Sequence, residues 1–292
     1  VLLTAPHGHV FHLELGTAGQ WPARNSCICV EFQCTCGEEQ EMGKLCFLHS
    51  SQDQLRNQEP SLLDTLCTGS YLDVEKTARW LPMLVRAAWT SLPESAAHQL
   101  KVLPSSRSCR LHLTDSFNQT VFLEMMFGVQ QGDSDIFLST QQTEAIFTSS
   151  TTWPQSCAVA EAAFFRHVAT HAQEDSFHLR CMQACACILV GYNFSAYKLK
   201  TVVLHLLAGT PLESWHKSIL HQRMDDIVQY LRRFLEEKHL DHFLTGNEAV
   251  PAEIVLPQGF EVARLLSLFQ HLVQEPANHV WVLREFKKLQ DR

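Results

Sequence analysis

The stretch from residue 27 to residue 49 concentrates side chains that bind soft metal ions. The candidate ligands are Cys27, Cys29, Cys34, Cys36, Cys46 and His49. Thiolate sulfur and imidazole nitrogen are the ligands of structural zinc sites. If residues 26–36 form one strand, the first two cysteines point to the opposite face from the next two, because side chains alternate along a strand. Four thiols then cannot converge on one tetrahedral ion, so we predict no metal site and a structural role for this stretch.

A second possible ligand set lies in a helical stretch further along the chain. His178, Cys181 and Cys185 are spaced by three and four residues, which places them on one helical stripe. A zinc site needs a fourth ligand, and none is indicated by the sequence. We therefore interpret this stripe as core packing.

Two carboxylates separated by one residue form a third candidate. Asp133 and Asp135 could hold a divalent cation if both pointed into a cleft. They directly follow Gly132 at the end of a predicted strand, which is typical of a polar turn. We favour the turn.

The elements that must position these groups change in type along the chain. Alternating apolar residues predict strands near residues 11–15, 28–32, 111–113 and 121–127, with a turn over 115–118 that joins the last two. Helical spacing predicts a helix over residues 74–88, with Asp73 as its N-cap. From Trp153 onward the period is 3.6 residues, most clearly over 217–238. We predict an α+β fold: a mixed lobe, residues 1–152, followed by an all-helical lobe, residues 153–292.

The bulk composition excludes several classes of protein. The chain has 292 residues, 46% of them hydrophobic, and a formal charge of −8, which argues against a broad nucleic-acid surface. Its 11 cysteines are odd in number and irregularly spaced, which favours a reduced, cytoplasmic domain over a disulfide framework. No apolar run is long enough to cross a bilayer. The abrupt start at Val1 predicts a fragment of a longer protein.

Longer runs of residues carry a family resemblance. The block from Phe194 to His205 resembles the start of the helical lobe in the male-abnormal-21-like family, a nucleotidyltransferase-fold group that includes cyclic GMP-AMP synthase. The runs 8–15, 57–67 and 128–139 resemble the inositol trisphosphate receptor-interacting protein branch and its like-proteins. The resemblance implies a nucleotidyltransferase-type sheet packed on a helical lobe, in a membrane-anchored parent protein.

The resemblance also implies what catalysis would require. Active relatives hold two metal ions with three carboxylates. Glu124 occupies the third of these positions, and as a carboxylate among apolar residues it should have a Lys or Arg neighbour. The other two acids are expected before Val1, outside this chain. We therefore predict a pseudo-nucleotidyltransferase with no cofactor, in which Glu124 is vestigial. The alternative is a metal-dependent nucleotidyltransferase whose acid pair lies outside the fragment.

Ligand binding without turnover is a further possibility. By resemblance, Ser195, Tyr197, Lys198 and Lys200 are candidate ligand-binding residues for a nucleotide or an inositol phosphate. Ala196 replaces the hydroxyl residue of active relatives, and Gln183 replaces a triphosphate-binding lysine. The alternative is an amphipathic helix start. Possible helper cations are Arg107, Arg110 and Arg180.

The expected function follows from these differences between the chain and its active relatives. Cyclic GMP-AMP synthase carries a zinc-binding insertion for DNA, but no cysteine lies between Cys157 and Cys181, so DNA sensing is not expected. We predict a protein-interaction and regulatory domain that binds no nucleic acid. The resemblance implies the inositol trisphosphate receptor as its partner, with an effect on calcium release.

Overall fold

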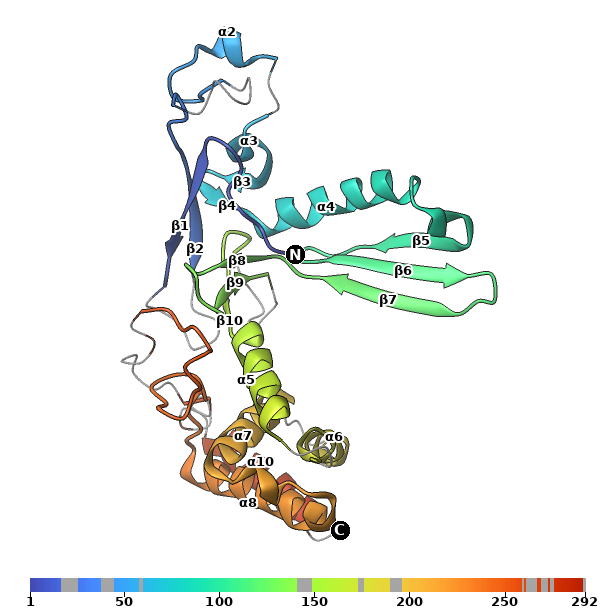
Figure 1. Ribbon diagram of the computed structural model, residues 1–292, viewed down its shortest axis with the longest axis vertical. Coiled ribbons are helices and arrows are strands. Elements are labelled where there is room, and N and C mark those ends of the chain that lie inside the picture. The colour runs from blue at the N-terminus through green and yellow to red at the C-terminus, as the bar shows by residue number, and fades with distance from the viewer. Residues whose placement is uncertain are drawn as a thin grey trace. The chain divides into compact units, whose positions relative to one another are not determined.

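A computed structural model describes most of the chain (Figure 1). The described residues are 1–16, 26–37, 45–57, 60–140, 149–172, 176–189, 196–258, 260, 267–268, 273 and 276–290. They form two compact units, Val1–Ser156 and Cys157–Arg292. This division falls slightly beyond the boundary at 152 and 153 that was expected from the sequence.

A four-stranded sheet opens the first unit, in the order β1-β2-β4-β3. Its strands are β1 (His9–Glu14), β2 (Cys27–Phe32), β3 (Cys67–Thr68) and β4 (Tyr71–Leu72). All neighbours are antiparallel, and the β1–β2 pairing runs from His9 opposite Phe32 to Glu14 opposite Cys27. Alternation along β2 buries Ile28 and Val30, as the sequence period predicts.

The second sheet is an antiparallel meander in the order β5-β6-β7. Its strands are β5 (His98–Leu103), β6 (Cys109–Asp115) and β7 (Thr120–Met125). The predicted turn between β6 and β7 is confirmed: Asp115 Oδ1 accepts from the N–H groups of Phe117 and Gln119, each at 2.8 Å. Asn118 adopts the left-handed conformation, with φ of 60°, that such a turn requires.

A third, short sheet has the order β10-β9-β8. Its antiparallel strands are β8 (Gly128–Gln130), β9 (Phe137–Ser139) and β10 (Gln155–Ser156). A single parallel bridge joins Leu2 to Gly128. The turn between β8 and β9 contains Asp133 and Asp135, with Gly132 at φ of 59° and Ser134 buried at its centre. The polar turn predicted for this stretch is confirmed.

The long helix of the first unit is α4 (Val74–Trp89), which runs beside the β5-β6-β7 sheet in Figure 1. It begins where predicted, because Asp73 Oδ1 accepts from the N–H of Lys76 at 3.0 Å. The shorter helices of this unit are α2 (Gln52–Leu55), α3 (Leu62–Leu66) and the 3-10 turn η1 (Pro93–Ala96). Ile28, Leu72 and Trp153 centre the core, and the indole N–H of Trp153 donates to the carbonyl of Leu72 at 2.8 Å.

In the part of the second unit that the structure describes, the named elements are all helices, and residues 239–258 form a non-helical segment after the longest of them. The helices are α5 (Ala158–His171), α6 (His178–Leu189), α7 (Ala196–Gly209), η2 (Leu212–Ser214), η3 (Lys217–Ile219), α8 (Leu220–Glu237) and α10 (Pro276–Gln290). Helices α6, α7 and α8 pack against one another, and α10 packs against α8. The helix predicted over 217–238 is confirmed: η3 leads into α8, which buries Ile227, Leu231 and Leu235.

Among the residues that the structure describes, no helix combines the length and the apolar character that crossing a bilayer requires.

Candidate functional site

Glu124 lies on β7, directly opposite Arg110 on β6. Its Oε1 accepts a hydrogen bond from Ser108 Oγ at 2.6 Å and another from Arg110 Nε at 2.8 Å. These two hydrogen bonds, from Ser108 first and Arg110 second, hold the pKa of Glu124 below its ordinary value. The expected cationic neighbour is therefore Arg110. A divalent cation at Glu124 would have to displace a guanidinium that already neutralises the carboxylate.

Lys200, on α7, forms an ion pair with Glu161 on α5. The glutamate side chain is only 4% exposed and the lysine side chain 29% exposed. Burial raises the pKa of Glu161, although the lysine opposes that shift. The Lys200 ammonium also lies 5.2 Å from the centroid of the Tyr197 ring. Two of the predicted ligand-binding side chains thus face each other and a buried acid.

His242 belongs to the same neighbourhood. Its ring centroid lies 6.1 Å from that of Tyr197, and its side chain is buried. Burial, reinforced by the charge of Lys200, lowers the pKa of His242 to about 3. The imidazole is therefore neutral near pH 7, as expected beside an ammonium group.

The structure says less about the other two predicted ligand-binding residues. Lys198 is partly exposed on α7, and Ser195 lies outside the described residues. Their role in ligand binding stays a prediction.

Of the proposed helper cations, Arg107 donates to the carbonyls of Thr140 and Thr152, at 3.2 and 2.8 Å. Arg180 lies 5.0 Å from the ring centroid of Phe177. With Arg110 paired to Glu124, all three guanidinium groups have partners within their own unit.

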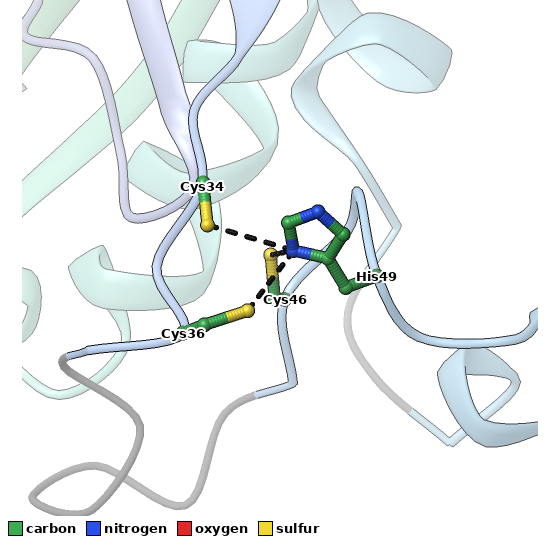
Figure 2. Close-up of side chains that lie close together, drawn as sticks. All are labelled: Cys34, Cys36, Cys46 and His49. Atoms are coloured by element: carbon green, nitrogen blue, oxygen red, sulfur yellow. Dashed lines mark hydrogen bonds between the residues drawn. The ribbon is translucent and has the colours of Figure 1, made fainter.

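The cysteine–histidine cluster consists of Cys34, Cys36, Cys46 and His49, four of the six candidate ligands that the sequence analysis interpreted as structural. Its four ligand atoms all lie within 4.8 Å of one another. Figure 2 shows the three sulfur atoms gathered around the imidazole. His49 Nδ1 lies 3.5 Å from Cys34 Sγ and 3.0 Å from Cys36 Sγ. The same nitrogen lies 3.7 Å from Cys46 Sγ.

The premise of one strand over residues 26–36 is wrong, because β2 ends at Phe32. Cys34 and Cys36 follow the strand in a non-strand segment, so strand alternation does not separate them. Cys27 and Cys29 remain on β2 and do not join the cluster. A usable signal was the combination of Cys-x-Cys with a later Cys-x-x-His.

The thiols of this cluster differ in their proton affinity. Backbone hydrogen bonds, first from Thr35 and then from Leu48, lower the pKa of Cys46 to about 6. For Cys36, hydrogen bonding to Cys34 raises the pKa to about 12, and proximity to Cys46 adds to the effect. Three neighbouring thiols cannot all ionise unless a cation offsets their mutual repulsion.

The second possible ligand set behaves as predicted. His178, Cys181 and Cys185 are all buried on α6, and His178 Nδ1 makes a 2.8 Å hydrogen bond with Ser176 Oγ. Burial raises the pKa of both thiols. Core packing is confirmed for this stripe.

An apolar surface lies on β7 and its turn, and we name Phe117, Val121, Phe122 and Leu123 the β7 patch. Their exposed fractions are 82%, 54%, 68% and 45%, respectively. Within the described part of the chain, β7 pairs with β6 alone. The sequence predicted this strand from its apolar alternation, but the side chains at 121 and 123 face solvent instead of a core.

Comparisons with known proteins agree with this architecture. The model of the Mab-21 protein HhH/H2TH-like domain matches residues 179–247, which span α6, α7 and α8. Inositol 1,4,5-trisphosphate receptor-interacting protein-like 1 of Rattus norvegicus is 33% identical over 99% of this chain and 55% of its own length. The chain belongs to the inositol trisphosphate receptor-interacting protein-like family.

More distant relatives carry the related name inositol 1,4,5-trisphosphate receptor-interacting protein. The Danio rerio protein is 28% identical over 86% of this chain and 48% of its own length. The Homo sapiens protein is 26% identical over 88% of the chain and 49% of its own length. The chain thus spans about half the length of the curated relatives it matches.

Family membership confirms the fold class predicted from the sequence. The chain has an α+β fold in which a nucleotidyltransferase-type lobe of sheets and helices precedes a helical lobe. The candidate residues Tyr197, Lys198 and Lys200 lie within the part of the chain that the family model matches.

Proposed function

We propose that this chain is a non-catalytic, protein-binding domain of a membrane-anchored regulatory protein, facing the cytoplasm. Its partner is the inositol trisphosphate receptor, and its effect is on calcium release through that receptor. The fold is that of a nucleotidyltransferase, used here as a scaffold.

The β7 patch is the observation that carries this proposal. A strand that exposes apolar side chains on both faces, with one neighbour among the described residues, is a surface suited to another protein. A partner strand could pair with its free backbone groups, and the apolar side chains could fill pockets on that partner. Phe122 would serve as the anchor because it is the largest apolar side chain on the strand and is 68% exposed.

The surroundings of Glu124 support a non-catalytic role. Its carboxylate is neutralised by Arg110 and hydrogen-bonded by Ser108. A metal ligand for nucleotidyl transfer needs a carboxylate that is open to a cation. The same reasoning applies to Lys200, whose charge is matched by buried Glu161 rather than directed to a phosphate.

The choice of partner comes from the relatives. Several of them are named as inositol 1,4,5-trisphosphate receptor-interacting proteins, including those of Danio rerio and Homo sapiens. In such an interaction, the β7 patch would be the surface of this chain that contacts the receptor.

Retention of the receptor on the immobilised chain tests the proposal. Detergent-solubilised receptor is passed over the wild-type chain and over the double variant Phe122→Thr, Leu123→Thr. Threonine keeps the strand propensity but removes the large apolar surface. We expect the double variant to bind at least ~10-fold more weakly, a loss of about 1.4 kcal/mol.

Val280→Ala serves as the matched control, because Val280 is 65% exposed on α10, far along the chain from β7. It should bind as tightly as the wild type. Equal receptor retention by the double variant and the wild type would exclude the β7 patch as the binding surface. In cells, the full-length protein should alter inositol trisphosphate-evoked calcium release, and the double variant should not.

The nucleotidyltransferase alternative is tested with the full-length protein, which supplies the residues before Val1. Incubation with nucleoside triphosphates and Mg²⁺ or Mn²⁺ should yield no nucleotidyl product. A product that forms with the wild type and disappears in Glu124→Gln would replace our proposal with the enzyme.

A further inference from the structure

We propose that the cysteine–histidine cluster binds one structural zinc ion. The site joins two segments that are separated in sequence: the segment that follows β2, with Cys34 and Cys36, and the turn that leads into α2, with Cys46 and His49. It is independent of the β7 patch and of any nucleotidyl-transfer site.

The spacing of the ligand atoms fits a tetrahedral ion. With Zn–S bonds near 2.3 Å and Zn–N bonds near 2.0–2.1 Å, tetrahedral geometry separates each sulfur from the nitrogen by ~3.6 Å. The distances from His49 Nδ1 to the three sulfur atoms are 3.5, 3.0 and 3.7 Å. Relative to His49 Nδ1, the largest adjustment that a zinc ion would need is at Cys36, and all pairs of candidate ligand atoms already lie within 4.8 Å of each other.

The donor set selects the metal. Three thiolates and one imidazole are soft and borderline ligands, which favour zinc over magnesium or calcium. Four protein ligands close the tetrahedron and leave no position for water, so the site would be structural rather than catalytic. The spacing Cys34-x-Cys36 followed by Cys46-x-x-His49 supplies one close pair of ligands from each segment.

Aromatic packing holds the two segments together near the site. The Phe47 ring, between the two ligands of the second segment, stacks on Phe32 at the end of β2, with centroids 5.4 Å apart. His9 on β1 packs against both rings, at 5.2 and 5.3 Å. At Gly8, a Cβ atom would lie only 2.8 Å from the Phe47 ring, so glycine permits this close approach. The end of the β1–β2 strand pair therefore packs against the segment that carries Cys46 and His49.

The electrostatics of the cluster also favour a cation. Backbone N–H groups of Thr35 and Leu48 donate hydrogen bonds to Cys46 Sγ. Such N–H donors to a ligating sulfur are the kind of outer contact that orients metal ligands. A divalent ion would offset the repulsion between three neighbouring thiolates.

The segment after the cluster has little core of its own. Throughout residues 45–57, all of which the structure describes, Cys46 alone is buried. The four residues of α2 bury none of their side chains. A segment without an apolar core needs another source of stability, and a bound zinc ion provides it because metal binding is coupled to folding.

A disulfide is the competing chemistry for neighbouring thiols. It would join two of the three cysteines and leave the third with His49. A disulfide would therefore explain the positions of only two of the four side chains. A zinc ion explains the positions of all four.

Metal content is the first measurement. The chain is expressed in a reducing cytoplasm, purified without chelator and analysed by mass spectrometry for bound elements. We expect one zinc per chain. After removal of the zinc, titration with Co²⁺ should give the visible absorption bands of tetrahedral cobalt and the ultraviolet charge-transfer band of thiolate ligands.

Substitutions assign the site. Cys36→Ser and His49→Ala should each weaken zinc binding by more than ~100-fold, because each removes a direct ligand. The matched control is Cys29→Ser, which removes a nearby thiol on β2 that lies outside the cluster. It should retain one zinc per chain. Circular dichroism of each variant would show whether the rest of the chain stays folded.

Three outcomes would overturn the proposal. One is a folded wild-type chain without zinc that also fails to bind Co²⁺ with thiolate charge transfer. Another is a mass two hydrogens below that of the reduced chain, with the disulfide mapped to two cysteines of the cluster. Zinc that persists in Cys36→Ser and His49→Ala but is lost in Cys29→Ser would place the ion elsewhere and would also refute the assignment.

Discussion

Each unit contains an ion pair that involves a residue predicted to belong to a functional site. In the first unit, Glu124 pairs with Arg110 across β7 and β6, with side chains 38% and 51% exposed. In the second unit, Glu161 pairs with Lys200 between α5 and α7, and the acid is 4% exposed. The two pairs have the same chemistry but differ in burial.

The difference in burial determines how much each ion pair contributes to the stability of the folded chain. An exposed pair is screened by water and salt, so its net contribution to stability is small. A buried pair must offset a large desolvation penalty, and removing one partner leaves a charge in a poorly solvated place. We therefore expect Lys200 to contribute more to the stability of its unit than Glu124 contributes to that of the first unit.

The largest expected effect is that of Lys200→Ala. It leaves the Glu161 carboxylate buried without its cation, so we expect the free energy of unfolding to fall by about 3 kcal/mol at neutral pH. Urea unfolding measures this value. Glu161→Gln should have a smaller effect, because the lysine side chain is 29% exposed and can reach water. Equal effects of the two substitutions would contradict the asymmetry of burial proposed here.

A pH series extends the comparison to His242, which is buried beside Lys200. Its pKa is lowered from 6.5 to about 3 in the folded chain. Below pH 6.5 the unfolded chain therefore binds a proton at this residue that the folded chain does not. The stability from this residue is present above pH 6.5 and is lost as the pH falls, by about 1.4 kcal/mol per unit below pH 6.

Unfolding of wild-type chain and His242→Gln at several pH values tests this slope. The variant should be less stable at pH 7, but its stability should fall less steeply with acid. Parallel curves for the two proteins would show that His242 does not carry the acid sensitivity.

The smallest effect is expected for Arg110→Ala. This substitution removes an exposed partner, so the free energy of unfolding should fall by less than ~1 kcal/mol. The loss should shrink further at high salt, because screening already weakens the wild-type pair. A loss as large as that of Lys200→Ala would remove the distinction between the two pairs.

Local sequence patterns were sufficient to predict several elements of the fold. Helix α4 with its Asp73 cap, α8, and the β6–β7 turn at Asn118 all depend on periodicity or local turn chemistry. Such signals arise within a few residues of one another. The family resemblance supplied the arrangement of lobes, which local patterns could not provide.

The cysteine–histidine cluster could not be predicted in the same way. The end of β2 at Phe32 depends on pairing with β1, which begins at His9. The approach of Phe47 to Phe32 is a tertiary contact that no spacing rule contains. The exposure of Val121 and Leu123 has a similar cause, since alternation shows that a strand has an apolar face but not whether that face is covered.

Arg107 has a consequence for how this lobe tolerates change. Its guanidinium holds the carbonyls of Thr140 and Thr152, two points separated by a short stretch of chain. Both threonines are buried, at 1% and 6% exposed, so these two carbonyls depend on the arginine for their donors. Because the ammonium group of lysine lacks the planar fork of a guanidinium, even Arg107→Lys should leave a buried carbonyl without its donor, and the lobe should therefore tolerate substitution at this position poorly.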